Sequence, residues 1–225
     1  MLVHGLVIPN RYMVPLARAL ASDFPVYAPD LPGFGESGRP RRVLGVPELA
    51  EALHAWMRAL GLARAALVAN SFGCQIVAEL AARHPEAADR LVLQGPTVDA
   101  DARSLPVQVW RTLRNGRTEP PALGRISAVD YAKAGLGRAV RTVRAMMRDR
   151  IEDKLPRVRA PTLVVRGSRD PVVPRAWAER VARSLPDGRL VVIEGATHTL
   201  NYADPDRLAV VVRTFLLSGG GSAAT

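Results

Sequence analysis

A serine at position 71 stands where an apolar run ends and a helical pattern begins. The run Ala65–Ala69 comes just before it, and Phe72 opens a stretch rich in alanine and leucine. A strand, a sharp turn with serine at its apex, and a helix form the setting of a nucleophile elbow. Ala69 and Gly73 are small, as close packing of the strand against the helix requires. Ser71 is therefore a candidate nucleophile, and a turn serine that caps the helix is the alternative.

A serine nucleophile needs a base that takes its proton and a carboxylate that orients the base. The pattern places His54 in the middle of a helix, His84 at a helix end and His4 at the end of the first strand. His198 follows the last predicted strand directly. Because the carboxyl ends of the strands carry the site in an open parallel sheet, His198 is the predicted base.

The predicted carboxylate also follows a strand. Asp170 comes after the apolar run at 161–167, one strand–helix unit before His198. Asp99, which comes after the strand that ends at Gln94, is the alternative acid.

Strands and helices alternate over most of the chain, and this alternation predicts a parallel sheet with helices on both faces. We expect a core over 1–96 and 161–217, a helical cap over 97–160 and a flexible tail over 218–225. Within the cap, Val140, Val143, Met147 and Ile151 predict one helix over 136–154 with a buried face. The strands are predicted at 2–3, 25–28, 65–69, 90–94, 161–167 and 190–193, and the core helices at 12–21, 47–60, 72–84, 174–185 and 204–217.

The order Ser71, Asp170, His198, with each residue at a strand end, resembles the α/β-hydrolase family. Two further stretches are similar to motifs of that family: His4-Gly5-Leu6, and the loop Asp30–Gly38 with its glycines and prolines. The family normally has two strands before the one that ends in His-Gly, and this chain has none. The segment 25–28 is therefore expected to form an unpaired strand at the sheet edge.

The resemblance implies the roles of the site residues. Ser71 would be the nucleophile, His198 the base and Asp170 its orienting acid, while the backbone amides of Leu6 and Phe72 would form the oxyanion hole. The implied reaction is hydrolysis of a carboxylic ester through an acyl-enzyme, without cofactor or metal. A serine at the elbow disfavours the dehalogenases and most epoxide hydrolases of this fold, which carry aspartate there.

Two other functions stay open. The pair Asn70-Ser71 resembles hydrolases that cleave carbon–carbon bonds in ring-fission products, although Thr199 stands where that group usually has tryptophan. The glycine-rich continuation of that group after His-Gly is also missing. A truncated or non-catalytic binding protein on the same scaffold is the third interpretation, because a fold does not fix a function.

Composition excludes several classes of protein. The single cysteine, Cys74, allows no internal disulfide and is predicted to be a buried packing residue, and four histidines leave little for a metal cluster. No apolar run approaches the roughly 18 residues that span a bilayer, and the first nine residues lack the features of a signal peptide. With 5% aromatic residues and no binding motif, nucleic acid is not expected. We expect a cytoplasmic enzyme with a small-molecule substrate.

The net charge of +10 is concentrated in the predicted cap. Between Arg103 and Arg159 there are twelve arginines and two lysines against five acidic residues, a local excess of nine. One interpretation is a solvated helix face, because Arg138, Arg141, Arg144 and Arg148 lie opposite the predicted apolar face. The other is that some of these arginines face the cleft and bind an anionic substrate, since guanidinium binds carboxylate in bidentate fashion.

Overall fold

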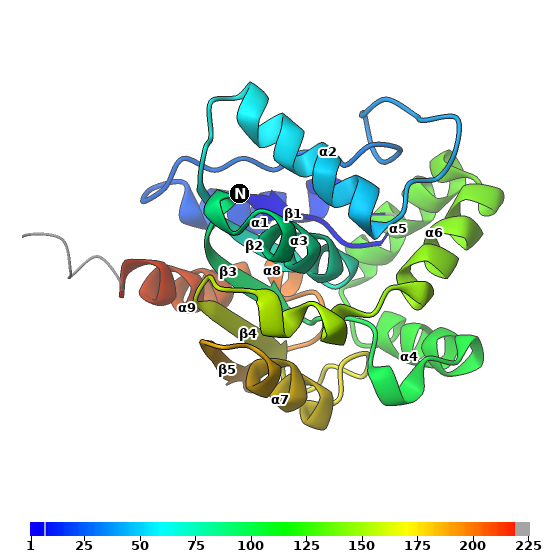
Figure 1. The fold of residues 1–225 in the computed structure, drawn as a ribbon. Helices are drawn as coiled ribbons and strands as arrows, with labels where there is room; N and C mark the ends of the chain where they lie inside the picture. The colour runs from blue at the N-terminus through cyan, green and yellow to red at the C-terminus, as the bar shows by residue number, and fades with distance from the viewer. Residues whose placement is uncertain (7, 219–225) are drawn as a thin grey trace, which may run out of the picture.

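A parallel sheet of five strands forms the centre of the molecule in the computed structural model, which describes residues 1–6 and 8–218 (Figure 1). Every pair of neighbouring strands is parallel, and the strands lie side by side in chain order. This confirms the predicted α/β class. The strands are β1 (Leu2–Val3), β2 (Ala65–Asn70), β3 (Ala88–Gln94), β4 (Thr162–Gly167) and β5 (Gly188–Ile193).

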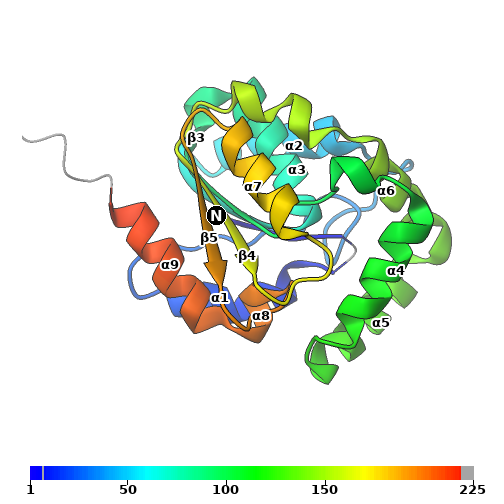
Figure 2. The same cartoon turned by 90° about the horizontal axis from the view of Figure 1, so that it is seen from below.

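Both faces of the sheet are buried, which explains why the strands are continuous apolar runs rather than alternating ones. In β2, Leu67 and Ala69 join one hydrophobic cluster, whereas Val68 joins the other. Figure 2 shows α2, α3 and α7 on one face and α1, α8 and α9 on the opposite face. These helices are α1 (Val14–Leu20), α2 (Val46–Ala59), α3 (Phe72–Arg83), α7 (Arg175–Ser184), α8 (Leu200–Ala203) and α9 (Pro205–Leu217).

Helix α2 shows how local sequence sets the helix bounds. Its first turn holds Pro47, and the carboxylate of Glu48 accepts a hydrogen bond from the amide of Gly45 at 2.8 Å, which satisfies a free helix donor. Leu49, Leu53 and Met57 recur at helical spacing and bury one face. The helix ends ahead of Gly61, which takes a positive φ of 72°.

The segment between β3 and β4 leaves the sheet and forms three helices beside one end of it (Figures 1 and 2). We call residues 97–160 the cap. Its helices are α4 (Leu105–Gly116), α5 (Pro121–Ala134) and α6 (Leu136–Arg148). Short 3-10 helices complete the described elements: η1 (Asn10–Tyr12), η2 (Pro85–Ala87), η3 (Ala100–Ala102), η4 (Ile151–Asp153) and η5 (Leu155–Arg157).

The prediction of one cap helix over 136–154 is wrong at its end, and of its predicted apolar face Val140 is exposed while Val143, Met147 and Ile151 pack against the core. Helix α6 stops at Arg148, and the chain continues through η4 and η5. Its buried residues are Ala139, Thr142 and Met146, whereas Val140 is 40% exposed. The most buried stripe of α6 is thus centred one position before the predicted residues, which lie beside it.

The prediction of a strand at 25–28 is also wrong. Pro25 and Tyr27 are exposed, and the segment has no strand assignment. One backbone hydrogen bond, from the Leu2 amide to the Tyr27 carbonyl at 2.7 Å, ties it to the free edge of β1. A single bond does not continue a ladder, so this segment lies along the edge without extending the sheet.

Other predictions concern burial, membrane helices and the tail. Cys74 is fully buried, as predicted, and burial raises the pKa of its thiol. Within residues 1–6 and 8–218, no helix has the length and apolar character needed to cross a bilayer. The predicted tail, from residue 219 onward, lies outside the described residues.

Candidate functional site

Ser71 occupies the sharp turn between β2 and α3. Its φ of 55° and ψ of −118° make it the one non-glycine residue with positive φ in the described part of the chain. Such a conformation costs about 1–3 kcal/mol and persists only where the surroundings enforce it. Gly73 belongs to the enforcing structure, because a Cβ there would lie 2.6 Å from the His4 carbonyl oxygen. The end of β1 thus passes directly over the first turn of α3.

His198 and Asp170 form a buried pair at the ends of neighbouring strands. The Nδ1 atom of His198 lies 2.8 Å from Oδ2 of Asp170, whose side chain is 0% exposed. The other carboxylate oxygen accepts hydrogen bonds from the amides of Val172 (2.7 Å) and Val173 (3.0 Å). These bonds leave Oδ2 aimed at the imidazole and fix the Nδ1–H tautomer, so that Nε2 is free to accept a proton.

The electrostatics of the pair favour a protonated imidazole. Burial by itself lowers the pKa of His198, but the charge of Asp170, the hydrogen bond with it and the charge of Glu119 together raise the pKa above its ordinary value. A base with a raised pKa takes a proton more readily.

Gly95, just beyond β3, packs against the imidazole. Its φ is 60°, and a Cβ on it would lie 2.8 Å from Cε1 and 2.9 Å from Nδ1 of His198. Only glycine leaves room for the ring where it meets Asp170.

Ser71 and His198 line the same pocket, which has a volume of about 290 Å³. This is at the lower end of the range of ligand pockets, roughly 300–1,000 Å³. Among the described residues, the hydroxyl of Ser71 makes no hydrogen bond to His198. Such bonds are often long in free enzymes and shorten when substrate binds.

Asp99, the alternative acid, pairs with two arginines and not with His198. Its Oδ2 accepts hydrogen bonds from both terminal nitrogens of Arg111 at 3.1 Å, and Arg180 lies 3.5 Å from Oδ1. Its carboxylate thus joins α4 to α7 instead of orienting a base, and Asp170 holds the position beside His198.

The two amides expected in the oxyanion hole have no acceptor within the described residues. Leu6 lines the pocket, and Phe72 is the first residue of α3, where backbone amides lack a partner inside the helix. The amide of Gly5, in contrast, donates to the hydroxyl of Tyr12 at 2.6 Å.

A buried polar network below Ser71 was not predicted from the sequence. Tyr12 donates from its hydroxyl to Oδ1 of Asn70 at 2.7 Å, and the side-chain amides of Asn70 and Gln94 both donate to the backbone carbonyl of His198. The network ties the His-Gly loop, the elbow and the His198 loop together. The available signal was the polar residue that ends each of two buried strands, Asn70 in β2 and Gln94 in β3.

Glu119, in the loop between α4 and α5, is a second residue that sequence reasoning missed. Its Oε1 accepts a hydrogen bond from the Thr199 amide at 3.0 Å, and its Oε2 accepts from the hydroxyls of Thr197 (3.1 Å) and Thr199. The cap thereby holds the residues on both sides of His198.

The cap arginines do not line this pocket. Its described lining residues include no arginine or lysine, and Glu119 is the one carboxylate among them. Arg141, Arg144 and Arg148 are exposed on α6, and Arg138 donates to the carbonyl of Pro40 at 3.0 Å. The positive charge of the cap therefore lies mainly on its outer surface.

Comparison with known proteins places the chain among hydrolases. Residues 1–211 match the family model described as the alpha/beta hydrolase family. The chain is also 28% identical over 227 residues to pyrrolizixenacetamide deacetylase from Xenorhabdus hominickii, a match that covers 90% of this chain and 84% of the deacetylase.

Two solved structures illustrate the shared fold. A thermophilic esterase from Thermogutta terrifontis superposes with a TM-score of 0.81 at 24% identity, covering 96% of this chain and 88% of the esterase. A meta-cleavage product hydrolase from Pseudomonas fluorescens gives 0.77 at 21% identity, with coverage of 96% and 89%. At these identities the likeness is one of fold.

Proposed function

The chain belongs to the alpha/beta hydrolase family, and on that premise we propose that it is a serine hydrolase that cleaves a carboxylic ester through an acyl-enzyme. The observation that carries the proposal is one pocket containing a serine at a strained strand–helix turn and a histidine paired with a buried carboxylate. These are the nucleophile, base and orienting group that acyl transfer requires.

The reaction proceeds in two halves. Ser71 Oγ attacks the ester carbonyl while His198 Nε2 takes the hydroxyl proton, and the imidazolium then protonates the departing alkoxide. Water attacks the acyl-enzyme in the second half with His198 again as base, which releases the acid and restores the serine. Asp170 stays ionised and stabilises the imidazolium through its 2.8 Å contact with Nδ1.

The developing oxyanion is stabilised by the amides of Leu6 and Phe72. Because neither amide has another acceptor in the described residues, both can donate to it. Each such donor is worth roughly 3–4 kcal/mol of transition-state stabilisation. The hydrogen bond between Gly5 and Tyr12 holds the adjacent backbone in place. The amide of Leu6 therefore needs little movement when substrate binds.

The pocket favours an uncharged substrate of modest size. Leu6, Ile8, Leu123 and Met146 give it apolar walls, and its neutral polar side chains include Gln108 and Asn115. A substrate carboxylate would face Glu119 without a compensating cation among the described lining residues. This argues against the anionic substrate that the cap arginines suggested.

No contact in the pocket favours carbon–carbon bond cleavage. The resemblance to that group rests on Asn70, whose side chain accepts from Tyr12 and donates to two backbone carbonyls. Asn70 thus has a structural role beneath the elbow, which any reaction at Ser71 would need.

Labelling with a fluorophosphonate tests the proposal and separates an enzyme from a non-catalytic binding protein. We expect wild type to be labelled and Ser71→Ala to lose labelling. Ser127→Ala is the matched control, because Ser127 lines the same pocket but bonds to Leu123 within α5. A panel of neutral esters, amides and ring-fission products then identifies the bond cleaved. Labelling that survives in Ser71→Ala, or its absence in wild type, would contradict the proposal.

A further inference from the structure

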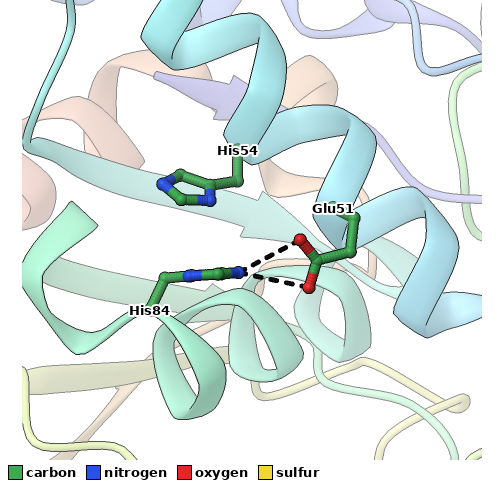
Figure 3. Close-up of side chains that lie close together, drawn as sticks. All are labelled: Glu51, His54 and His84. Carbon is green, nitrogen blue, oxygen red and sulfur yellow. Dashed lines mark hydrogen bonds and ion pairs between the residues drawn. The ribbon is translucent and has the colours of Figure 1, made fainter.

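Two histidines and a glutamate gather on the surface of the α2–α3 layer, apart from the proposed active site (Figure 3). Glu51 and His54 are three residues apart and project from one side of α2, and His84 follows the end of α3. One ligand atom from each of the three side chains lies within 4.8 Å of the other two. The imidazole centroids lie 3.9 Å apart with the ring planes tilted by 33°, and Nε2 of His84 lies 3.1 Å from both oxygens of Glu51.

We propose that Glu51, His54 and His84 form a binding site for a divalent transition metal of the zinc class. Two imidazoles and one carboxylate suit Zn²⁺, Ni²⁺ or Cu²⁺, whereas Mg²⁺ and Ca²⁺ prefer oxygen ligands alone. Three protein ligands leave a fourth position for water. The expectation of no metal cluster counted histidines and cysteines along the chain, and it could not see that residues 54 and 84 meet in space.

The distances require one side chain to move. Metal–ligand bonds of about 2.0–2.2 Å in tetrahedral geometry place ligand atoms roughly 3.3–3.6 Å apart. The separation between His84 and Glu51 is already close to this value, so His54 must turn toward them by about an ångström or more. Both histidines are only half-buried, and His54 borders an open surface hollow that it shares with Glu86. This space allows the ring to turn and the metal to enter.

Charged side chains next to the three proposed ligands contact them and affect their orientation. Glu86 lies 3.6 Å from Nδ1 of His84, which is the side of the ring opposite the nitrogen that faces Glu51. Metal-bound histidines usually give their second ring nitrogen to a carboxylate in this way, which fixes the tautomer. Arg83 competes for Glu51 at 3.6 Å, but it also has a closer partner in Glu79.

Metal bound here would connect α2 to the end of α3, because the ligands come from both elements. It would therefore stabilise the folded chain by an amount that rises with the logarithm of the free metal concentration once that concentration exceeds Kd. The site lies outside the pocket that contains Ser71, so this inference does not depend on the proposed hydrolase activity.

Titration of the full chain with Zn²⁺ by calorimetry, repeated with Co²⁺ by visible absorption, tests the proposal. We expect one equivalent to bind, a Co²⁺ spectrum typical of low coordination number, and a Tm increase of roughly 5–10 °C when free Zn²⁺ is about 100 times its Kd. His54→Ala, His84→Ala and Glu51→Gln should each weaken binding by more than tenfold. Glu86→Gln should weaken it by roughly tenfold, as an outer-shell change does.

His198→Ala is the control, since a metal held by the buried pair with Asp170 would depend on that residue. It should bind Zn²⁺ as wild type does. Tm values with chelator present will show that the variants are folded. The proposal is overturned if wild type shows neither heat nor thermal shift with excess Zn²⁺, or if binding persists in His54→Ala and His84→Ala.

Discussion

Different interactions stabilise the end of the sheet below Ser71 and the cap that faces it. Below Ser71, the polar groups of Tyr12, Asn70 and Gln94 are buried and bonded to one another or to backbone, within a core of apolar side chains. The cap instead leaves Trp110, Leu113 and Leu136 more than half exposed, at 57%, 63% and 82%.

Apolar side chains near the end of the cap, among them Ile151 and Leu155, join the hydrophobic core, and the cap also reaches the core through polar links. Arg138 reaches the carbonyl of Pro40, Arg11 pairs with Asp130, and Glu119 holds the two threonines beside His198. Hydrogen bonds and ion pairs exchange with water at little net cost, whereas buried apolar area does not. The contrast indicates a layer of buried, mutually bonded polar groups under Ser71, beside a cap whose helix α4, with Gln108 as its one buried residue, gains the least from apolar burial.

Asp170→Asn tests the sheet end, where Asp170 pairs with His198, and has the largest expected effect. An amide holds imidazole in the wrong tautomer, so we expect kcat for the best neutral ester to fall by about 10⁴-fold. Asp99→Asn is the matched change, because Asp99 pairs with arginines of α4 and α7. It should affect the stability of the cap far more than kcat. A larger loss of kcat in Asp99→Asn would move the acid to the earlier strand.

Lys154→Ala tests the buried link where the cap returns to the core. The Lys154 ammonium lies between Glu79 of α3 and Asp149 at the end of α6, and all three side chains are less than 10% exposed. Its removal leaves Asp149 buried without a side-chain partner among the described residues and Glu79 with Arg83 alone, so the free energy of unfolding should drop by about 3–5 kcal/mol. Urea denaturation measures this.

The control is the other lysine of the chain. Lys133 is exposed on α5, and Lys133→Ala should change the stability by less than about 0.5 kcal/mol. If the two variants unfold at the same urea concentration, the ion-pair cluster does not fasten the cap.

Glu119→Gln tests the one cap carboxylate that contacts the His198 loop. Glutamine keeps an acceptor for Thr199 but removes the negative charge that helps to raise the pKa of His198. The base works in its neutral form, and its pKa should fall. The acid limb of the kcat/KM profile should therefore shift to lower pH, by at most about one unit.

Glu36→Gln, which changes a carboxylate outside the pocket, should leave the profile in place. A shift of the Glu119→Gln limb to higher pH would show that the hydrogen bonds to the threonines matter and the charge does not.

The smallest effect concerns the cap arginines. With their charge outside the pocket, an ester with a remote carboxylate should gain only a few-fold in kcat/KM over its neutral isostere at low salt. The gain should vanish at high salt, because exposed charges act over a Debye length of about 8 Å at physiological ionic strength. A preference that survives high salt would mean that a guanidinium contacts the substrate.

The sequence was most informative where strand ends dictate position. Ser71, Asp170 and His198 each follow an apolar run, and parallel strands bring their carboxyl ends to one edge. Whether they act together stays a prediction, but the pair of Asp170 and His198 is in place. The position of Glu119 could not be predicted, because a loop between two cap helices carries no periodic signal that places it near His198.

The errors have physical reasons. The centre of the α6 face was misplaced because Ala139 and Thr142 are buried although neither is strongly apolar, whereas the apolar Val140 is exposed. The 25–28 segment has strand-like residues, but strand structure depends on partners, and it makes one ladder-type bond. Residues 54 and 84 could not be brought together without the packing of α2 on α3.

The position of Gly95 against the His198 ring limits which substitutions residue 95 tolerates. Every missense change of a glycine codon adds a Cβ, and at this position a Cβ would occupy the space of the His198 ring. In a mutational scan that scores abundance and activity separately, substitutions at residue 95 should group with those of His198. They should abolish turnover while sparing much of the folded protein, although residue 95 has no proton to exchange and no atom that reacts.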